Sequence, residues 1–252
     1  MSKPSLFEAT SGRKIAYRKT SGTEPGVVFL GGFMSDMEGT KATYLEVWAR
    51  DQGRAFLRFD YSGHGQSSGT FADGCIGEWA DDAQQVISGL TKGPQILVGS
   101  SMGGWVALLM AKRIPKKIAG LVGIAAAPDF TEDSMWDGFS DDQKTTIMES
   151  GLLALDSDYS DDPYIITRKL IEDGRKQLVL RTPLNLPFPA RFLHGTADTD
   201  VNISVALRLL DHAKGNDLRL TLVKGADHSF SEPENLLMVR RAIHAVTMKS
   251  WR

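Results

Sequence analysis

The chain has 252 residues, of which 42% are hydrophobic, so it is long enough to bury a sizeable core. Its formal net charge of -2 provides no generic electrostatic attraction to nucleic acid or anionic lipid, which argues against binding to either. The sequence has one cysteine, Cys75, and therefore no internal disulfide, and no group of Cys and His has the spacing of a zinc site.

No segment of the sequence has the pattern of a targeting or membrane-spanning element. The amino-terminal residues lack the continuous apolar stretch of a signal peptide, and no run of about 18 apolar residues occurs. We therefore expect no membrane span and a cytoplasmic location, which also suits a chain with a single thiol. A homo-oligomer remains an open alternative to a monomer.

Hydrophobic periodicity predicts the secondary structure from residue 26 onward, where apolar, β-branched runs alternate with longer segments of helical period. The expected strands end where Gly, Asp or Ser begins a turn, and they span 27–30, 55–59, 95–98, 119–124, 190–194 and 218–223. The expected helices, several of which end in basic residues, span 40–51, 76–90, 102–113, 203–214 and 234–249.

This alternation is typical of parallel strands covered by helices. Two shorter runs, 7–10 and 14–18, flank Ser11-Gly12 and predict an antiparallel hairpin at the amino end. We therefore expect an α/β fold with a sheet of about eight mostly parallel strands, flanked by helices.

One segment interrupts the alternation. Between Pro128 and Pro187 the sequence is rich in Asp and in helix-forming residues, with scattered apolar side chains. We interpret residues 128–187 as a short helical cap within a single domain that spans 1–252, over the edge where open α/β sheets bind ligands. Its acidic residues are expected to form a solvated face: Glu132, Asp133, Asp137, Asp141 and Asp142.

The segment from Ile96 to Trp105 predicts a strand, a G-x-S-x-G turn and then a helix. Such a sharp turn needs small flanking residues, which Gly99 and Gly103 provide. It lifts the hydroxyl of Ser101 clear of the sheet, at a helix amino end that favours negative charge. We predict that Ser101 is a nucleophile; the alternative is a Gly/Ser turn without chemistry.

A serine hydroxyl is a poor nucleophile near neutral pH, so it needs a base and a group that orients the base. His228 lies in a loop after the last expected strand, at the carboxyl edge of the sheet, and is the predicted base. The other histidines lie in a turn, at a strand end or on helices, where structural roles are expected: His64, His194, His212 and His244.

The orienting acid should follow another strand and lie between the serine and the histidine in chain order. Asp198, after the expected strand 190–194, meets both conditions. Asp129 is an alternative acid, whereas Asp200 is expected to begin or cap the next helix. Asp227 adjoins the base, but adjacency along a loop does not give the geometry needed to hold an imidazole.

The expected oxyanion donors are backbone amides close to the nucleophile turn. Gly31 and Gly32 leave the first parallel strand, which favours the amides of Phe33 and Met102, although a glycine pair is also typical of an ordinary tight turn. An apolar acyl pocket under the cap is predicted from four side chains, for which ordinary packing is the alternative: Met34, Trp105, Trp136 and Leu153.

Together these residues resemble the α/β-hydrolase superfamily, in which the same elbow and the order serine, acid, histidine occur. Segments 58–67 and 93–105 are similar to a narrower group of mitochondrial depalmitoylases and acyl-glucuronide esterases. The resemblance implies a triad of Ser101, Asp198 and His228. One departure is Gly31, where many members of the superfamily have histidine.

We therefore expect a serine hydrolase that cleaves an ester or thioester through an acyl enzyme, with a small-molecule or acyl substrate and without a metal or organic cofactor. A medium or long acyl chain fits the expected apolar pocket. Two alternatives remain at this point. The same triad can act on a lactone, an amide or a carbon–carbon bond beside a ketone, or the chain can be a non-catalytic, ligand-binding relative.

Overall fold

The structure is a computed structural model that describes residues 3–155 and 163–249. Its main sheet contains β1 (Ser5–Glu8), β2 (Lys14–Thr20), β3 (Thr23–Leu30), β4 (Arg54–Phe59), β5 (Gln95–Ser100), β6 (Ile118–Ile124), β9 (Ala190–Gly195) and β10 (Leu218–Val223). The strands lie in the order β1-β2-β4-β3-β5-β6-β9-β10. β2 is antiparallel to β1 and to β4, whereas the remaining pairs are parallel.

The central strands are apolar along their length because helices cover both of their faces. In register, Val28 of β3 lies beside Leu97 of β5, which lies beside Leu121 of β6. Since parallel strands end at the same edge of a sheet, the turns that follow β3, β5, β6 and β9 meet there. The expected α/β-hydrolase fold, with about eight mostly parallel strands flanked by helices, is confirmed.

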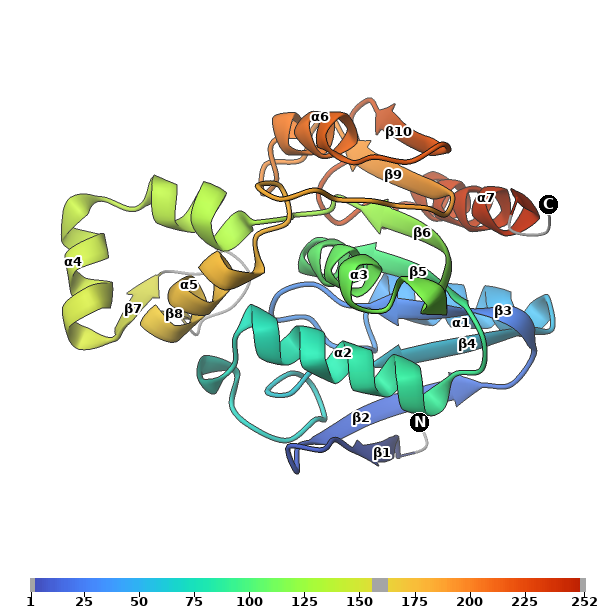
Figure 1. The fold of residues 1–252 in the computed structure, drawn as a ribbon, viewed down its shortest axis with the longest axis horizontal. Helices are drawn as coiled ribbons and strands as arrows, with labels where there is room; N and C mark the ends of the chain where they lie inside the picture. The colour runs from blue at the N-terminus through green and yellow to red at the C-terminus, as the bar shows by residue number, and fades with distance from the viewer. Residues whose placement is uncertain (1–2, 156–162, 250–252) are drawn as a thin grey trace.

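The helices form a layer on each side of the sheet (Figure 1). The longer ones are α1 (Thr40–Asp51), α2 (Ile76–Leu90), α3 (Met102–Arg113), α6 (Ile203–His212) and α7 (Pro233–Lys249), and η1 (Phe71–Asp73) and η2 (Pro115–Lys117) are short 3-10 turns. α1 and α7 share one buried cluster with Val98 of β5, whereas α2, α3 and α6 pack on the opposite face. Across 3–155 and 163–249, no helix is both long and apolar enough to cross a membrane.

The first strand of the amino-terminal hairpin is displaced by two residues from its expected position, because β1 ends at Glu8 and not at Thr10, whereas the second strand begins at Lys14 as expected. The turn begins earlier than the sequence suggests. The Ala9 amide donates to the Arg13 carbonyl at 2.9 Å, and the Gly12 amide donates to the Ala9 carbonyl at 2.8 Å. These bonds use the backbone groups that a longer first strand would need.

Residues 125–189, here called the insertion, connect β6 to β9 and extend beyond the edge of the sheet at which β6 ends (Figure 1). It contains the π-helical turn η3 (Thr131–Trp136), α4 (Asp141–Ser150), β7 (Leu152–Leu155), β8 (Tyr164–Thr167), α5 (Arg168–Gly174) and the 3-10 turn η4 (Arg175–Gln177). The expected helices are therefore present in this segment, but so is an antiparallel pair, β7 with β8, that the sequence did not predict. Strands of four residues are too short for a clear alternating pattern.

Candidate active site

Ser101 lies in the turn between β5 and α3, and its backbone adopts φ 53° and ψ -119°. A non-glycine residue rarely has this conformation, so the surrounding structure must hold it in place. The Ser101 amide donates to the Ile124 carbonyl at 2.9 Å, and the Ala127 amide donates to the Ser101 carbonyl at 3.1 Å. The nucleophile elbow expected from the sequence therefore has the strained geometry that presents a side chain at the sheet edge.

The two glycines that frame Ser101 are needed for close packing. A Cβ atom at Gly99 would overlap the carbonyl oxygen of Gly103, and a Cβ atom at Gly103 would overlap the carbonyl oxygen of Leu30. Both obstacles are backbone atoms, which cannot move as the end of a flexible side chain can. Glycine at these positions allows α3 to approach β5 and β3 closely enough to form the turn.

His228 lies in the loop between β10 and α7, and its ring faces the Asp198 carboxylate, which follows β9. The Nδ1 atom of His228 is 2.9 Å from Oδ2 of Asp198, and the side chain of Asp198 is fully buried. The Val201 amide donates to the other carboxylate oxygen at 2.9 Å. Burial opposes ionisation of Asp198, but the bonds from His228 and Val201 outweigh burial, and the pKa of this carboxyl lies below its ordinary value.

Ser101 and His228 line the same cavity, which has a volume of about 730 Å³. The structure thus brings together at one sheet edge three residues that are far apart in the chain. Part of the cavity wall is apolar and comes largely from the insertion and the loop after β3: Phe33, Met34, Ala127, Phe130, Met135 and Tyr164. Another part is polar: Lys41, Thr199, Asp200, Asp227 and Ser229.

The two expected oxyanion donors flank the elbow. Met102 is the first residue of α3, where an amide has no acceptor within the helix, and Phe33 lies in the cavity wall. The loop that carries Phe33 is held in place by side chains at and after the end of β4. The carboxylate of Asp60 accepts from the Met37 amide at 2.6 Å, and the Arg58 guanidinium donates to the Met37 carbonyl at 2.6 Å.

Of the four predicted pocket residues, Met34 lines the cavity, and Trp105, Trp136 and Leu153 are not among its described lining residues. Trp105 is fully buried within the domain, where its indole donates to the Gln177 carbonyl at 3.1 Å. The Trp136 ring lies under the guanidinium of Arg175, and Leu153 packs against the main core from β7. Ordinary packing was the alternative given for these residues, and the structure shows it for all three.

The sequence did not single out several residues of this cavity. Phe130 and Met135 lie in the first part of the insertion, after β6, so the segment that follows this strand end was a usable signal for them. Tyr164 reaches the cavity through the pairing of β7 with β8, and Lys41 through the packing of α1 beside the loop of His228. Only the folded arrangement reveals these two contributions.

The alternative acids have other partners. Asp129 is fully buried and accepts from the Val179 amide at 2.8 Å, the Leu180 amide at 3.0 Å and the Arg181 guanidinium at 3.0 Å. Burial raises the pKa of Asp129 although these donors oppose the shift. Asp227 accepts from the Ser229 hydroxyl and the Phe230 amide. Asp200 lines the cavity, and the cap of α6 is Asn202, so the capping role expected for Asp200 is wrong.

His64 is buried among aromatic rings, 5.0 Å from the ring of Trp79 and 5.1 Å from that of Phe71. Its Nδ1 atom is 3.2 Å from the Ser62 carbonyl oxygen. Burial disfavours the charged ring and lowers the pKa of His64 to about 4. This histidine is therefore neutral in the folded protein near neutral pH.

The neutral His64 ring predicts a loss of stability in mild acid. The unfolded chain binds a proton on this ring near pH 6.5, whereas the folded ring resists protonation down to about pH 4. The contribution of the neutral ring to the free energy of unfolding is fully present above about pH 6.5 and is lost as the pH falls toward 4. Roughly 2 kcal/mol is lost by about pH 5. Between pH 7 and pH 5, urea unfolding should show a smaller decrease in the free energy of unfolding for His64→Phe than for wild type. The control variant His244→Gln, at an exposed histidine, should show the same decrease as wild type. Equal losses in all proteins would contradict this prediction.

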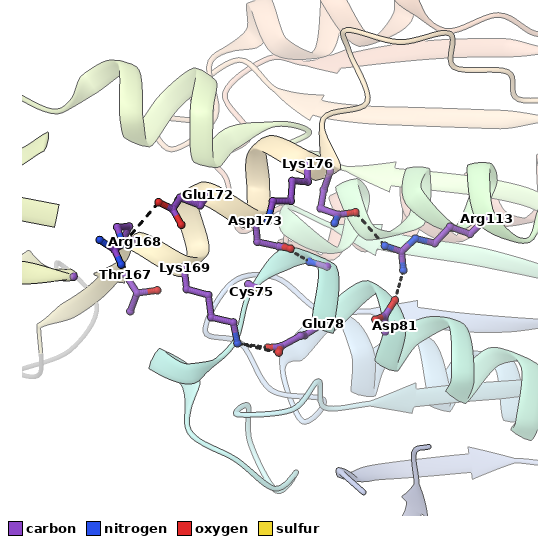
Figure 2. Close-up of a pocket in the computed structure, with 13 residues that line it drawn as sticks. Cys75, Glu78, Asp81, Arg113, Thr167, Arg168, Lys169, Glu172, Asp173 and Lys176 are labelled. Carbon is purple, nitrogen blue, oxygen red and sulfur yellow. Dashed lines mark hydrogen bonds and ion pairs between the residues drawn. The ribbon is translucent and has the colours of Figure 1, made fainter. Parts of the chain in front are cut away.

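A second cavity, of about 540 Å³, lies between α2 and α5 and is lined by charged side chains (Figure 2). The Lys169 ammonium is 2.9 Å from the Glu78 carboxylate, and the Asp173 carboxylate accepts from the Gly77 amide at 2.6 Å. Cys75 also lines it, but burial raises the pKa of its thiol to about 12, which keeps the thiol protonated. The contacts in this cavity join the insertion to the main domain.

Comparisons with known proteins agree with this architecture. The sequence profile of the Alpha/beta hydrolase family matches residues 27–239. The human palmitoyl-protein thioesterase ABHD10, mitochondrial, is 34% identical over 226 residues, which cover 89% of this chain and 74% of that protein. A putative hydrolase from Agrobacterium vitis S4 superposes with a TM-score of 0.91 at 38% identity, covering 96% of both chains. The mouse alpha/beta hydrolase domain-containing protein 10 has a TM-score of 0.90 at 31% identity, covering 98% of this chain and 99% of that one. The chain therefore belongs to the alpha/beta hydrolase family, as its motifs indicated.

Proposed function

We propose that this hydrolase cleaves a carboxylic ester or thioester, with Ser101 as nucleophile, His228 as base and Asp198 as the acid that orients the base. The observation that carries the proposal is the 2.9 Å contact between His228 Nδ1 and the buried Asp198 carboxylate. This contact fixes the ring so that its other nitrogen is available on the cavity that Ser101 also lines.

In the proposed reaction, the Oγ–H proton of Ser101 passes to Nε2 of His228 while Oγ bonds to the carbonyl carbon. The carbonyl π electrons move to oxygen, and the amides of Phe33 and Met102 stabilise the oxyanion. Collapse restores the carbonyl and breaks the bond to the leaving oxygen or sulfur, which takes the proton from the imidazolium. Water then gives a proton to His228 and adds its oxygen to the acyl carbon, and a second collapse returns the proton to Ser101 and releases the acid.

A medium or long acyl chain is the proposed substrate. The insertion, which acts as a cap in this proposal, contributes Phe130, Met135 and Tyr164 to an apolar wall beside Ser101. An apolar wall at this position favours an acyl chain over a polar group. The human relative is named a palmitoyl-protein thioesterase, which supports the same direction.

Octanoyl and palmitoyl thioesters should be hydrolysed with a kcat/KM roughly tenfold or more above that of the acetyl thioester, because each methylene buried on the wall contributes up to about 0.8 kcal/mol. Steady-state assays with one common thiol leaving group measure the ratios. Tyr164→Ser should reduce the octanoyl preference, and Trp136→Ser, which alters the insertion outside the cavity, should retain it. A steep preference for acetyl in the wild type would contradict the proposed acyl site.

A further inference from the structure

Lys41 lies at an unexpected place in its helix. It is the second residue of α1, whose first turn has no acidic side chain. The amino end of a helix carries partial positive charge and disfavours a cation, so the helix itself gives no reason for a lysine here. Local rules broken in this way are expected at sites that serve another purpose.

The contacts of Lys41 point to the loop that carries His228. The Lys41 ammonium donates to the backbone carbonyl of Ser229, the residue after His228. It also interacts favourably with the carboxylate of Asp227, the residue before His228. Burial lowers the pKa of Lys41, and the Asp227 charge opposes that shift. One side chain on α1 is thus bonded to one neighbour of His228 and attracted by the charge of the other.

The loop is also anchored on both sides of the base. Before His228, the Ala197 amide donates to the Ala226 carbonyl at 3.0 Å, and the Gly225 amide donates to Oγ1 of Thr196 at 2.9 Å. Phe230, which is fully buried and has a φ of 49°, anchors the carboxyl side of His228. Within this loop, the Asp198 carboxylate bonds to the imidazole ring of His228 and not to the backbone. Between these anchors, Lys41 ties the carbonyl of Ser229, the residue directly after His228, to α1.

We propose that Lys41 is a positioning residue that holds the His228 loop so that the imidazole reaches Ser101. The inference rests on the proposed function, because it assigns a purpose to Lys41 only if His228 is the base. Lys41 lines the cavity as well, so contact with the substrate is the competing role. The two roles differ in what they change: a positioning residue affects proton transfer for every substrate, whereas a substrate contact affects some substrates more than others.

The test compares wild type, Lys41→Met, Lys41→Arg and the exposed control Lys116→Met on acetyl and octanoyl thioesters. Lys41→Met should lower kcat by about tenfold or more on both substrates, with KM changed by less than about twofold, since a slightly misplaced base slows the chemical step. The rate of labelling by a fluorophosphonate should fall in parallel. Lys41→Arg, which keeps a cationic donor, should recover most of the rate, and Lys116→Met should equal wild type.

Several outcomes would overturn the inference. The first is a Lys41→Met enzyme as fast as wild type, and the second is a change in that variant confined to KM or to one substrate. The third is a Lys41→Arg variant that has the melting temperature of wild type but does not recover the rate. If Lys41→Met fails to fold, the comparison of Lys41→Arg with Lys41→Gln decides, and equal rates in these two contradict the need for a cation. A wild type that neither labels nor hydrolyses would overturn the proposed function and this inference together.

Discussion

Ser101→Ala is expected to lower kcat by about 10⁴-fold or more and to abolish labelling by a fluorophosphonate, because no other group takes the place of the attacking oxygen. The strained turn at φ 53° supports this expectation, since it presents one side chain at the sheet edge. The neighbouring Ser100 provides a matched control, because it is the last residue of β5 and is itself buried. Ser100→Ala should keep both labelling and turnover.

The same active site predicts effects that do not add. His228→Ala and Asp198→Asn should each lower kcat by about 10⁴-fold, and the double variant Ser101→Ala/His228→Ala should be no slower than the slower single variant. Residues that act as a unit lose their joint effect when any one of them is removed. Steady-state kinetics on one thioester measure the four variants. Independent, multiplying losses, or full labelling of Ser101→Ala, would contradict the proposed roles.

Gly103→Ala is expected to destabilise the fold by about 3 kcal/mol or more, because its Cβ would overlap the carbonyl oxygen of Leu30. Relief requires α3 to move away from β3, which would also displace Ser101. Urea unfolding measures the stability, and activity should fall in whatever fraction remains folded.

Gly138→Ala is the matched control for this change, because a Cβ atom there meets nothing within 4 Å. It should leave the free energy of unfolding within about 0.5 kcal/mol of wild type or raise it slightly. A Gly103→Ala protein as stable as the Gly138→Ala protein would show that the close approach of α3 to β3 is not needed.

The strands and helices of the main domain were predictable from the sequence because periodicity follows burial. The runs at 27–30 and 95–98 are buried on both faces and, apart from Gln95, are continuously apolar; they form parts of β3 and β5. The β7–β8 pair was not predictable. Each strand has four residues, and the pairing depends on neighbours rather than on a local pattern.

For the candidate site, the sequence predicted residues that follow strand ends but not residues placed by packing between elements. Asp198 and His228 each follow a strand at the same edge, and chain order was enough to propose them together. Trp105 was predicted to line an apolar pocket under the cap, yet on α3 its side chain is fully buried in the core. Lys41 contacts Ser229 in the His228 loop although the two residues are 188 positions apart in the sequence. No sequence pattern encodes that contact.

The buried carboxylate of Asp129 has a consequence for how this protein can diversify. Through its bonds to Val179 and Leu180, 50 and 51 positions away, it ties the start of the insertion to its end. The insertion therefore leaves the strand edge and returns to it at one fixed place, and its further bonds to α2 hold it against the domain. If the proposed function holds, substitutions at the cavity-lining positions of the insertion can change which substrates fit, while Asp129 keeps both ends of the insertion in place beside the elbow.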